Sequence, residues 1–327
     1  MKREKKKISL DKILIVSIFI VLAIYVVSLL LPLGWGLLTS LKSRRDFEVL
    51  GNILGFPNLD AAISRDTFFK LSNYTFLFRE IKIETSVGFF SGLNLDVAVE
   101  HSVNASILKM LYNTLVYAVL GSLVTTSVTM WVAYLCAKYR FKFSSIVYSV
   151  VLITMAVPIV GTSASTITLL RRLGMYDTLW GNMIQKFHFT GMYFLLFYAF
   201  FEAIPDTYSE AAEIDGASQL MVALKIILPL SSTIFTTVVL INFIGLWNDF
   251  STARLYLPTH PTIAYAIYEF TLGKYAAQLN KPVNGNPAPG IPGKIAFCML
   301  LALPIIILFV CLRNKIMGNI NSGGIKG

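Results

Sequence analysis

Charged residues are scarce in this sequence. Asp, Glu, Lys and Arg make up only 14% of its 327 residues, whereas hydrophobic residues make up 55% and the mean hydropathy is +0.67. A soluble domain of this length does not bury so much apolar surface, so an ordinary soluble enzyme is excluded. Glycine and proline are too few, and the apolar residues too strongly gathered into blocks, for a disordered or collagen-like chain. The composition therefore predicts a membrane protein.

Residues that form disulfides or hold metals are also few. Cys136, Cys298 and Cys311 lie inside or at the ends of apolar blocks, so we expect small buried residues rather than disulfide partners. The three histidines are far apart in the sequence and lack the spacing of metal ligands. We therefore predict no metal site.

No motif for catalysis or nucleotide binding stands out. Gly290, Gly293 and Lys294 lack the spacing of a phosphate-binding loop, and there is no G-x-S-x-G nucleophile elbow. The net charge of +10 is not arranged as a basic stripe interleaved with aromatic residues, which nucleic acids would require. We expect no catalytic residues, no cofactor and no nucleic-acid partner.

Long apolar blocks are what the sequence does have. About 20 apolar residues in a helix span a hydrocarbon core roughly 30 Å thick. Because backbone groups in lipid must bond within their own segment, and the blocks lack the alternation of barrel strands, each should be a helix. Six transmembrane helices are predicted, at about 13–38, 107–137, 146–170, 184–201, 231–247 and 295–312. The predicted fold class is an all-α membrane protein with one transmembrane domain over 13–327.

The basic residues predict the orientation. Residues 1–12 hold a cluster of Lys and Arg, and such clusters stay in the cytoplasm. The first block is too long for a cleaved signal and no A-x-A-like site closes it, so it should be a retained helix. Six crossings then place both termini and the segment 202–230 inside. Lys42, Arg44 and Arg45, just after the first helix, argue against this orientation.

Two long segments fall on the predicted outer side. The segment 42–106 carries both charge signs in near balance and includes short alternating pieces such as 81–87, so we expect a partly folded external loop. The segment 248–294 ends in a series of glycine, proline and asparagine turn signals between Asn284 and Gly293. We expect it to be ordered only in part.

The segment 202–230 has a distinctive pattern. Thr207 followed by Glu210 has the form of a capping box, which predicts a short helix. Gly216 gives the backbone freedom for a turn, and Pro229 can begin the fifth crossing as a first-turn proline. Three alanines should keep one surface of this segment flat, so that another protein can approach it closely: Ala211, Ala212 and Ala217.

This spacing of Glu-Ala-Ala, three residues, Gly, nine residues and Ile-x-Leu-Pro resembles the signature of membrane subunits of ATP-binding cassette (ABC) importers. The resemblance implies a type I importer permease, in which the segment forms a coupling helix that docks on a cytoplasmic ATPase subunit. The implied contact residues are Glu210, Ala211, Ala212, Asp215, Gly216 and Ala217. The alternative is that Glu210 merely caps a helix and Gly216 merely turns the chain. A match over twenty residues at a predicted cytoplasmic turn disfavours it.

Within that family the chain resembles the carbohydrate-importer branch, which includes the maltose-type permeases. The fragments that carry this second resemblance are Ser40-Leu41-Lys42, Asn73-Tyr74, Asn113-Thr114-Leu115, Tyr139-Arg140-Phe141, Gly174-Met175-Tyr176-Asp177-Thr178-Leu179-Trp180-Gly181 and Trp247-Asn248-Asp249-Phe250. Each is weak alone, but their order is specific. The stretch between Tyr74 and Asn113 departs from the branch because it is longer than usual.

The resemblance implies a pore-forming subunit of an ATP-driven carbohydrate importer in the bacterial cytoplasmic membrane. It also implies a second related permease, two ATPase subunits that bind ATP and Mg²⁺, and an external solute-binding protein. One alternative is an importer for polyamines, amino acids or phosphorus compounds. Another is an ion-coupled secondary transporter, which would show mid-membrane ionisable residues or inverted repeats, and neither is evident here.

A few polar and aromatic residues are candidates for the substrate path. Trp247 could offer an aromatic face to a sugar, and Asn248 and Asp249 could offer hydrogen bonds. Asn113 and Asn242 lie within crossings, where an amide needs a helix partner or a wet cavity. The alternative is structural: an indole at the membrane interface, a helix cap, and amides that join helices.

Overall fold

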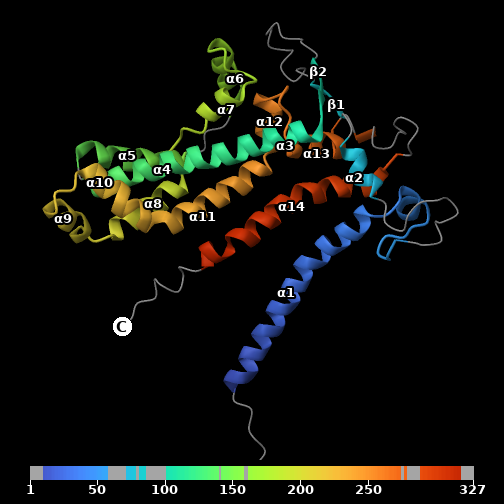
Figure 1. The fold of residues 1–327 in the computed structure, drawn as a ribbon, viewed down its shortest axis with the longest axis horizontal. Coiled ribbons are helices and arrows are strands. Elements are labelled where there is room, and N and C mark those ends of the chain that lie inside the picture. Colours follow the sequence, from blue (N-terminus) through green and yellow to red (C-terminus); the bar gives the residue numbers. More distant parts are fainter. Residues whose placement is uncertain are drawn as a thin grey trace, which may run out of the picture. The chain divides into compact units, whose positions relative to one another are not determined.

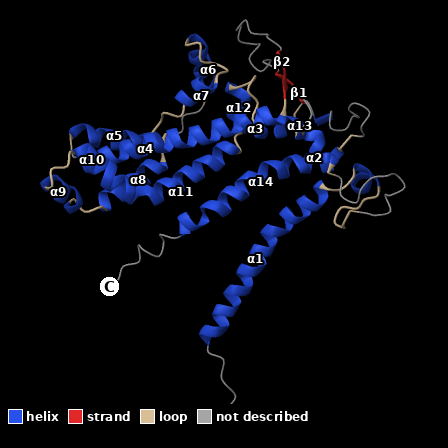
Figure 2. Ribbon diagram, in the orientation of Figure 1, coloured by secondary structure: helices blue, strands red, loops and turns tan. Residues whose placement is uncertain are grey.

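A computed structural model of the chain describes residues 10–57, 71–78, 81–85, 101–139, 141–157, 161–273, 276–277 and 288–317. Helices make up most of these residues (Figures 1 and 2). The chain divides into two compact units, one formed by Met1–Phe78 with Phe270–Ala302 and the other by Arg79–Glu269 with Leu303–Gly327.

The first unit contains a long apolar helix, α1. Its elements are α1 (Leu10–Ser40), a π-helical turn η1 (Arg45–Val49), α2 (Ser72–Leu77) and the beginning of α14 (Gly290–Met317). From Leu14 to Ser40 the side chains of α1 are apolar on nearly all sides, and none of its most hydrophobic window is buried in the chain, which is the pattern of a membrane-spanning helix. Gly36 of α1 allows a close approach to α14, because a Cβ there would lie 2.8 Å from the Met299 Cε.

The second unit holds most of the helices. Its elements are β1 (Ile81–Thr85), β2 (His101–Ala105), α3 (Ile107–Leu115), η4 (Val116–Leu120), α4 (Gly121–Lys138), α5 (Lys142–Ala156), α6 (Ser163–Arg172), α7 (Leu179–Ile184), α8 (Met192–Ala203), α9 (Thr207–Ile214), α10 (Gln219–Val222), η5 (Ala223–Ile227), α11 (Leu228–Trp247), α12 (Phe250–Tyr256) and α13 (Ile263–Thr271). The two strands pair antiparallel, with Ile81 opposite Ala105 and Thr85 opposite His101.

The core of this unit lies where α4, α8 and α11 pack side by side (Figure 1). Aromatic residues recur along α8 at helical spacing, so Phe194, Phe197 and Phe201 share one buried face. Tyr134 of α4 meets Phe201 edge-on, with ring centroids 5.4 Å apart. The buried aromatic residues of this region therefore serve packing.

Four helices among the described residues are long and apolar enough to cross a membrane. They are Leu14–Ser40, Ile107–Lys138, Gln219–Trp247 and Gly290–Cys311. Two further apolar helices, α5 and α8, are shorter, with 15 and 12 residues, or roughly 22 and 18 Å at 1.5 Å per residue. The membrane-spanning, mostly helical fold is confirmed, and the total of six crossings stays a prediction.

Two of the predicted helices are wrong in their extent. The block 146–170 contains α5 and α6 rather than one helix, since Val157 is extended before Pro158 and Gly161 has a φ of +83°. The block 184–201 is helical only from Met192, after Gly191 with a φ of +125°. The segments beyond these breaks are more polar than the helices beside them: α6 is polar on average whereas α5 is apolar, and Gln185, Lys186 and His188 precede the strongly apolar α8.

Other boundaries also differ from the sequence prediction. The last helix begins at Gly290 rather than near 295, because Pro292 lies in the first turn, where the missing N–H is not needed. The fifth helix begins before 231, since α10, η5 and α11 are continuous. Cys136 is buried as predicted, whereas Cys298 and Cys311 are exposed on α14.

Some predictions fall outside the described residues. These concern most of the basic N-terminus, much of the external loop within 42–106, Arg140, the turn signals from Asn284 to Pro287, and the tail after 317. The short alternating piece near 81 does form a strand, β1, so one antiparallel pair accompanies the helices.

Candidate functional site

The signature segment folds as a short helix, a tight turn and a second helix. After α9 the Gly216 N–H donates to the Glu213 carbonyl at 2.9 Å, and the Ala217 N–H donates to the Ala212 carbonyl at 2.9 Å. This pair of hydrogen bonds at a helix end requires a residue with left-handed backbone geometry between the helices. Gly216 is that residue, with a φ of +82°. The predicted turn at Gly216 is confirmed.

The predicted capping box at the start of α9 is wrong. Thr207 lies inside the helix, the residue before it is Asp206 in helical geometry, and no side chain caps the N-terminus. The Asp206 carboxylate instead accepts a hydrogen bond from Lys138 of α4 at 2.7 Å. A capping box depends on an extended residue at the helix start, and the contact with Lys138 holds Asp206 elsewhere.

Side chains at the end of α4 fasten the segment to the core. The mostly buried Lys138 ammonium also donates to the Ile204 carbonyl at 2.6 Å. Tyr139 donates to the Gln219 Oε1 at 2.7 Å, and the Gln219 amide donates to Glu213. These bonds join α9 and α10 to the end of α4 in the transmembrane core.

The solvent-exposed surface of the segment carries acidic side chains and one large apolar side chain. Glu210, Ala211, Glu213 and Asp215 are exposed, and Ile214 is 86% exposed. Ala212 and Ala217 face the other way and pack against the core cluster. An acidic surface with a projecting isoleucine has the composition of a contact for a basic partner with an apolar groove.

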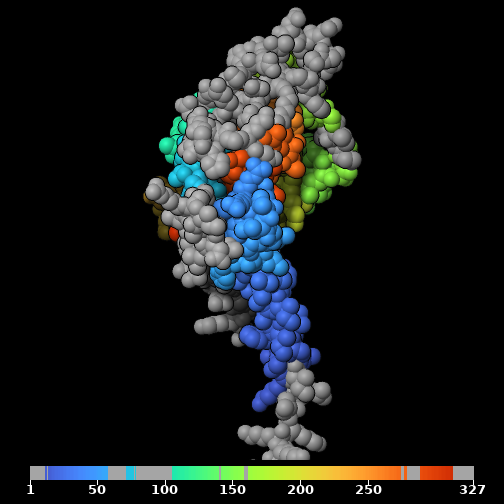
Figure 3. Space-filling view, turned by 90° about the vertical axis from the view of Figure 1, so that its right-hand side faces the viewer, coloured from blue at the N-terminus to red at the C-terminus, as the bar shows by residue number. Residues whose placement is uncertain are grey.

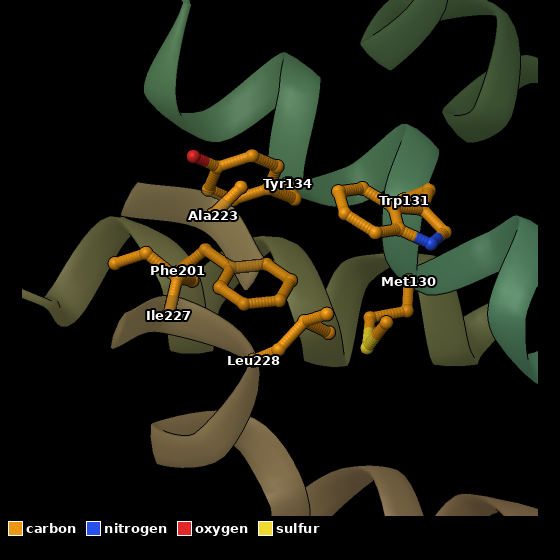
Figure 4. A pocket seen from close by; sticks show the side chains of 7 residues that line it. All are labelled: Met130, Trp131, Tyr134, Phe201, Ala223, Ile227 and Leu228. Atoms are coloured by element: carbon orange, nitrogen blue, oxygen red, sulfur yellow. The ribbon is translucent and has the colours of Figure 1, made fainter. Parts of the chain in front are cut away.

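A π-helical turn connects the segment to α11. Pro229 lacks an N–H and its ring would meet the carbonyl of residue 225 in a regular helix, so the preceding turn widens to the π form, η5. A small cavity of about 10 Å³ lies beside this turn, between α4, α8 and α11 (Figure 4). Its lining is apolar: Met130, Trp131, Tyr134, Phe201, Ala223, Ile227 and Leu228.

The candidate path residues have partners within the chain. Asn113 is buried and donates to the Pro261 carbonyl at 3.1 Å, and Asn242 donates to the Thr126 hydroxyl at 2.9 Å. Trp247 is 1% exposed and packs against Phe243, with ring centroids 5.4 Å apart. Asn248 is exposed and its amide donates to the carbonyl of residue 244 at 2.8 Å. Asn242 therefore joins α11 to α4, and Asn113 joins α3 to the segment before α13. Of these four residues only Asn248 is exposed.

Asp249 lies in a polar cluster that sequence reasoning missed. Its carboxylate accepts from Tyr117 at 2.7 Å and caps α12 through the Thr252 N–H at 3.0 Å. Lys186, between α7 and α8, donates to the Tyr117 hydroxyl at 3.1 Å. Burial acts to raise the pKa of Asp249, but hydrogen bonds from Thr252, Tyr117 and Ser251 outweigh it and hold that pKa below its usual range. The sequence did contain one indication of this cluster, because Lys186 is a lysine inside a predicted transmembrane helix and such a residue needs a polar partner.

The fragment from Gly174 to Gly181 ties the α6–α7 turn to α12. The Asp177 carboxylate accepts from the Thr259 N–H at 3.0 Å and from its hydroxyl at 2.7 Å. Thr178 caps α7 by accepting from the Gly181 N–H at 3.0 Å. At Gly181 a Cβ would lie 2.0 Å from the Met175 carbonyl oxygen, so only glycine fits. This fragment therefore has a structural role in the second unit.

Comparison with known proteins decides the family. The model for the family described as "Binding-protein-dependent transport system inner membrane component" matches residues 127–320, which is more than half of the chain and includes the whole signature segment. The chain belongs to this family. Its members are transport permeases, and the family description places them in the inner membrane.

Relatives and a solved structure agree with this family. A sulfoquinovosyl glycerol transport system permease of Agrobacterium fabrum is 23% identical over 94% of this chain and 93% of its own length. A maltose/maltodextrin transport system permease of Vibrio vulnificus is 26% identical over 68% and 73%. A bacterial ABC transporter for the acidic polysaccharide alginate superposes with a TM-score of 0.68 at 19% identity, over 95% of this chain and 99% of that chain. The superposition confirms the predicted permease fold.

Trp247→Ala tests whether the indole serves packing or the substrate path. Because Trp247 is buried, we expect truncation to cost about 3–5 kcal/mol of folding free energy. The yield of folded protein should fall, while transport per folded complex stays close to that of the parent. Trp247→Phe should restore most of the yield. Normal yield with lost transport in Trp247→Ala would instead place the indole on the path.

Proposed function

We propose that this chain is the pore-forming permease subunit of an ATP-driven carbohydrate importer. Membership of the binding-protein-dependent family supports it, as do relatives named for maltose, for a sulfosugar glycoside and for alginate. The observation that carries the proposal is the signature segment, which forms an exposed helix and turn joined to the core by Lys138 and Gln219.

The proposed mechanism is mechanical. The acidic surface of α9 docks on an ATPase subunit, and closure of the ATPase dimer moves α9 together with α4 and α10, to which side chains bond this segment. The motion reaches α11 because α10, η5 and α11 are continuous. The transmembrane helices then rock between inward-open and outward-open states. ATP and Mg²⁺ bind to the ATPase subunits, so this chain supplies no catalytic residue and no cofactor site of its own.

The proposed assembly has a second related permease, two ATPase subunits and an external solute-binding protein. In this arrangement the segment 202–230 faces the cytoplasm together with both chain termini, and the loop after α1 lies outside. The binding protein selects the carbohydrate, which passes between the two permeases. The direct substrate contact expected from this chain is Asn248, because its side chain is exposed whereas the other path candidates are buried or partly buried.

Glu210→Lys tests the proposal. The reversal places a cation opposite an ATPase surface that is expected to be basic. Such repulsion at a partly buried contact typically costs a few kcal/mol of binding free energy. We expect the variant to insert and fold, but to retain at least about tenfold less ATPase when the permease is purified by affinity tag. The matched control is Glu202→Lys, which reverses an exposed acid on α8, outside the signature. Equal ATPase retention in both variants would contradict the proposed docking.

A further inference from the structure

In the ordered loop that follows α1, residues 43–57, large apolar side chains lie at the surface and several polar groups lie inside. Large apolar side chains point outward: Leu54 is 83% exposed, Val49 73% and Phe56 72%, and Leu50 and Ile53 are also exposed. In the space-filling view the residues after α1 form a broad surface at the end of that helix (Figure 3). Apolar residues gathered this densely on a short loop indicate a surface that water does not cover.

The charged side chains of Lys42 and Asp46 at the base of this loop are buried, whereas Arg45 is exposed. Lys42 is 1% exposed, and its ammonium donates to the carbonyls of Asn52 at 2.7 Å and Ile53 at 3.2 Å. The Trp35 indole donates to the Ile53 carbonyl at 2.8 Å, and the Asn52 amide donates to the Phe56 carbonyl at 2.7 Å. Side chains of the same unit thus bond the carbonyls of Asn52, Ile53 and Phe56 at the apolar tip of the loop.

Hydrogen bonds between side chain and backbone also hold the base of the loop. The buried Asp46 accepts from the Asn52 amide at 3.1 Å, and its carbonyl accepts from the Asn52 N–H at 3.1 Å. At Gly55 a Cβ would collide with the Asn52 side chain, so the chain passes close to that amide. The loop is therefore one ordered body with a polar interior.

Two fragments of the sequence resemblance fix this body to α1. Asn73 is buried, and its amide donates to the carbonyls of Ser40 and Lys42, each at 2.8 Å. The hydroxyl groups of Ser40 and Tyr74 lie 2.7 Å apart. The fragments Ser40-Leu41-Lys42 and Asn73-Tyr74 therefore close the C-terminal end of α1 and orient the loop relative to it.

The depth of the loop follows from the length of α1. The apolar span Leu14–Ser40 has 27 residues, roughly 40 Å at 1.5 Å per residue. That length fills a bilayer of about 40–45 Å including its headgroups, so the end of α1 lies among the headgroups. Backbone carbonyls at this depth lose water and need internal donors, whereas a loop in bulk water would not.

We propose that the loop 43–57 is an interfacial membrane anchor, which inserts Ile53, Leu54 and Phe56 into the headgroup and acyl-chain boundary of the leaflet where α1 ends. The outward apolar side chains, the internally bonded carbonyls and the continuous lipid-facing surface of α1 all fit a lipid partner. The exposed Arg45 lies at its base and suits anionic headgroups, whereas Arg44 is paired with Glu48 at 2.7 Å. The proposal requires only that α1 spans a membrane, so it does not depend on the transported substrate.

A depth measurement tests the anchor. In the full chain with Cys136, Cys298 and Cys311 replaced by alanine, an environment-sensitive nitrobenzoxadiazole label is attached at Leu54→Cys or, as control, at the exposed Thr75→Cys of α2. The protein is placed in nanodiscs of phosphatidylcholine and phosphatidylglycerol, with or without lipids that carry a nitroxide near the headgroup. We expect at least about twofold stronger quenching at 54 than at 75.

Two outcomes would overturn the anchor. One is equal quenching at both positions. The other is a label at 54 that responds only when the external binding protein is added, which would make the loop a protein contact. In Asn52→Ala, which removes the amide bonded to Phe56 and Asp46, quenching at 54 should fall toward that at 75. Unchanged quenching there would overturn the role assigned to the polar interior.

Discussion

Gly216→Val is expected to leave the permease in the membrane but to uncouple it from the ATPase. The φ of Gly216 is +82°, and a β-branched residue in that region costs about 1–2 kcal/mol or more. The turn between α9 and α10 would rearrange to avoid this strain, and α9 would lose its orientation. We expect stimulation of ATP hydrolysis by loaded binding protein to fall at least about tenfold, as measured in reconstituted complexes.

Two matched variants separate loss of coupling from simple strain. Gly174 also has a positive φ, +67°, and like Gly216 has open space where a Cβ would lie, but it is in the α6–α7 turn. Gly174→Val should therefore cost similar stability and leave stimulation nearly intact. Gly216→Asn should retain coupling, because asparagine tolerates this conformation. Full stimulation of ATP hydrolysis in Gly216→Val would show that coupling to the ATPase does not depend on the geometry of this turn.

Replacing either charged member of the Lys186, Tyr117 and Asp249 cluster is expected to destabilise the second unit. Lys186→Met leaves the Asp249 carboxylate without a nearby cation, and Asp249→Asn leaves the ammonium without its counter-charge. A buried polar group left without its partner costs about 1–3 kcal/mol. Each single variant should therefore unfold several degrees lower than the parent protein in nanodiscs.

The double variant Lys186→Met with Asp249→Asn should be more stable than the sum of the single losses predicts. Removing both charges leaves no lone charge behind, so we expect at least half of the lost stability to return. Lys225→Met, at an exposed lysine of the same unit, is the control and should change little. Strict additivity of the two losses would mean that the charges do not interact. Recovery of folding without recovery of transport would show that the cluster also acts during transport.

Local features were predictable from the sequence because neighbouring residues decide them. The apolar blocks predicted helices, and four of them are long enough to span a membrane. Gly216 predicted a turn, since a left-handed residue after a helix is recognised from the glycine itself. Thr207 and Glu210 failed as a capping box because Lys138, 68 residues before Asp206, decides the geometry of that end.

The sequence by itself determined that this chain crosses membranes, which apolar blocks contain helices, and which segment has the signature of its family, because composition, hydropathy and short spacings are local. Only the tertiary structure decided which polar groups meet. Tyr117 is 132 residues from Asp249 and 69 from Lys186, and Asn73 is 33 residues from Ser40. Such contacts depend on how helices pack and on which buried donors still need an acceptor, and no periodicity in the sequence encodes that. For the same reason the inward-facing Lys42 and the outward-facing Leu54 could be recognised only once the loop between them was folded.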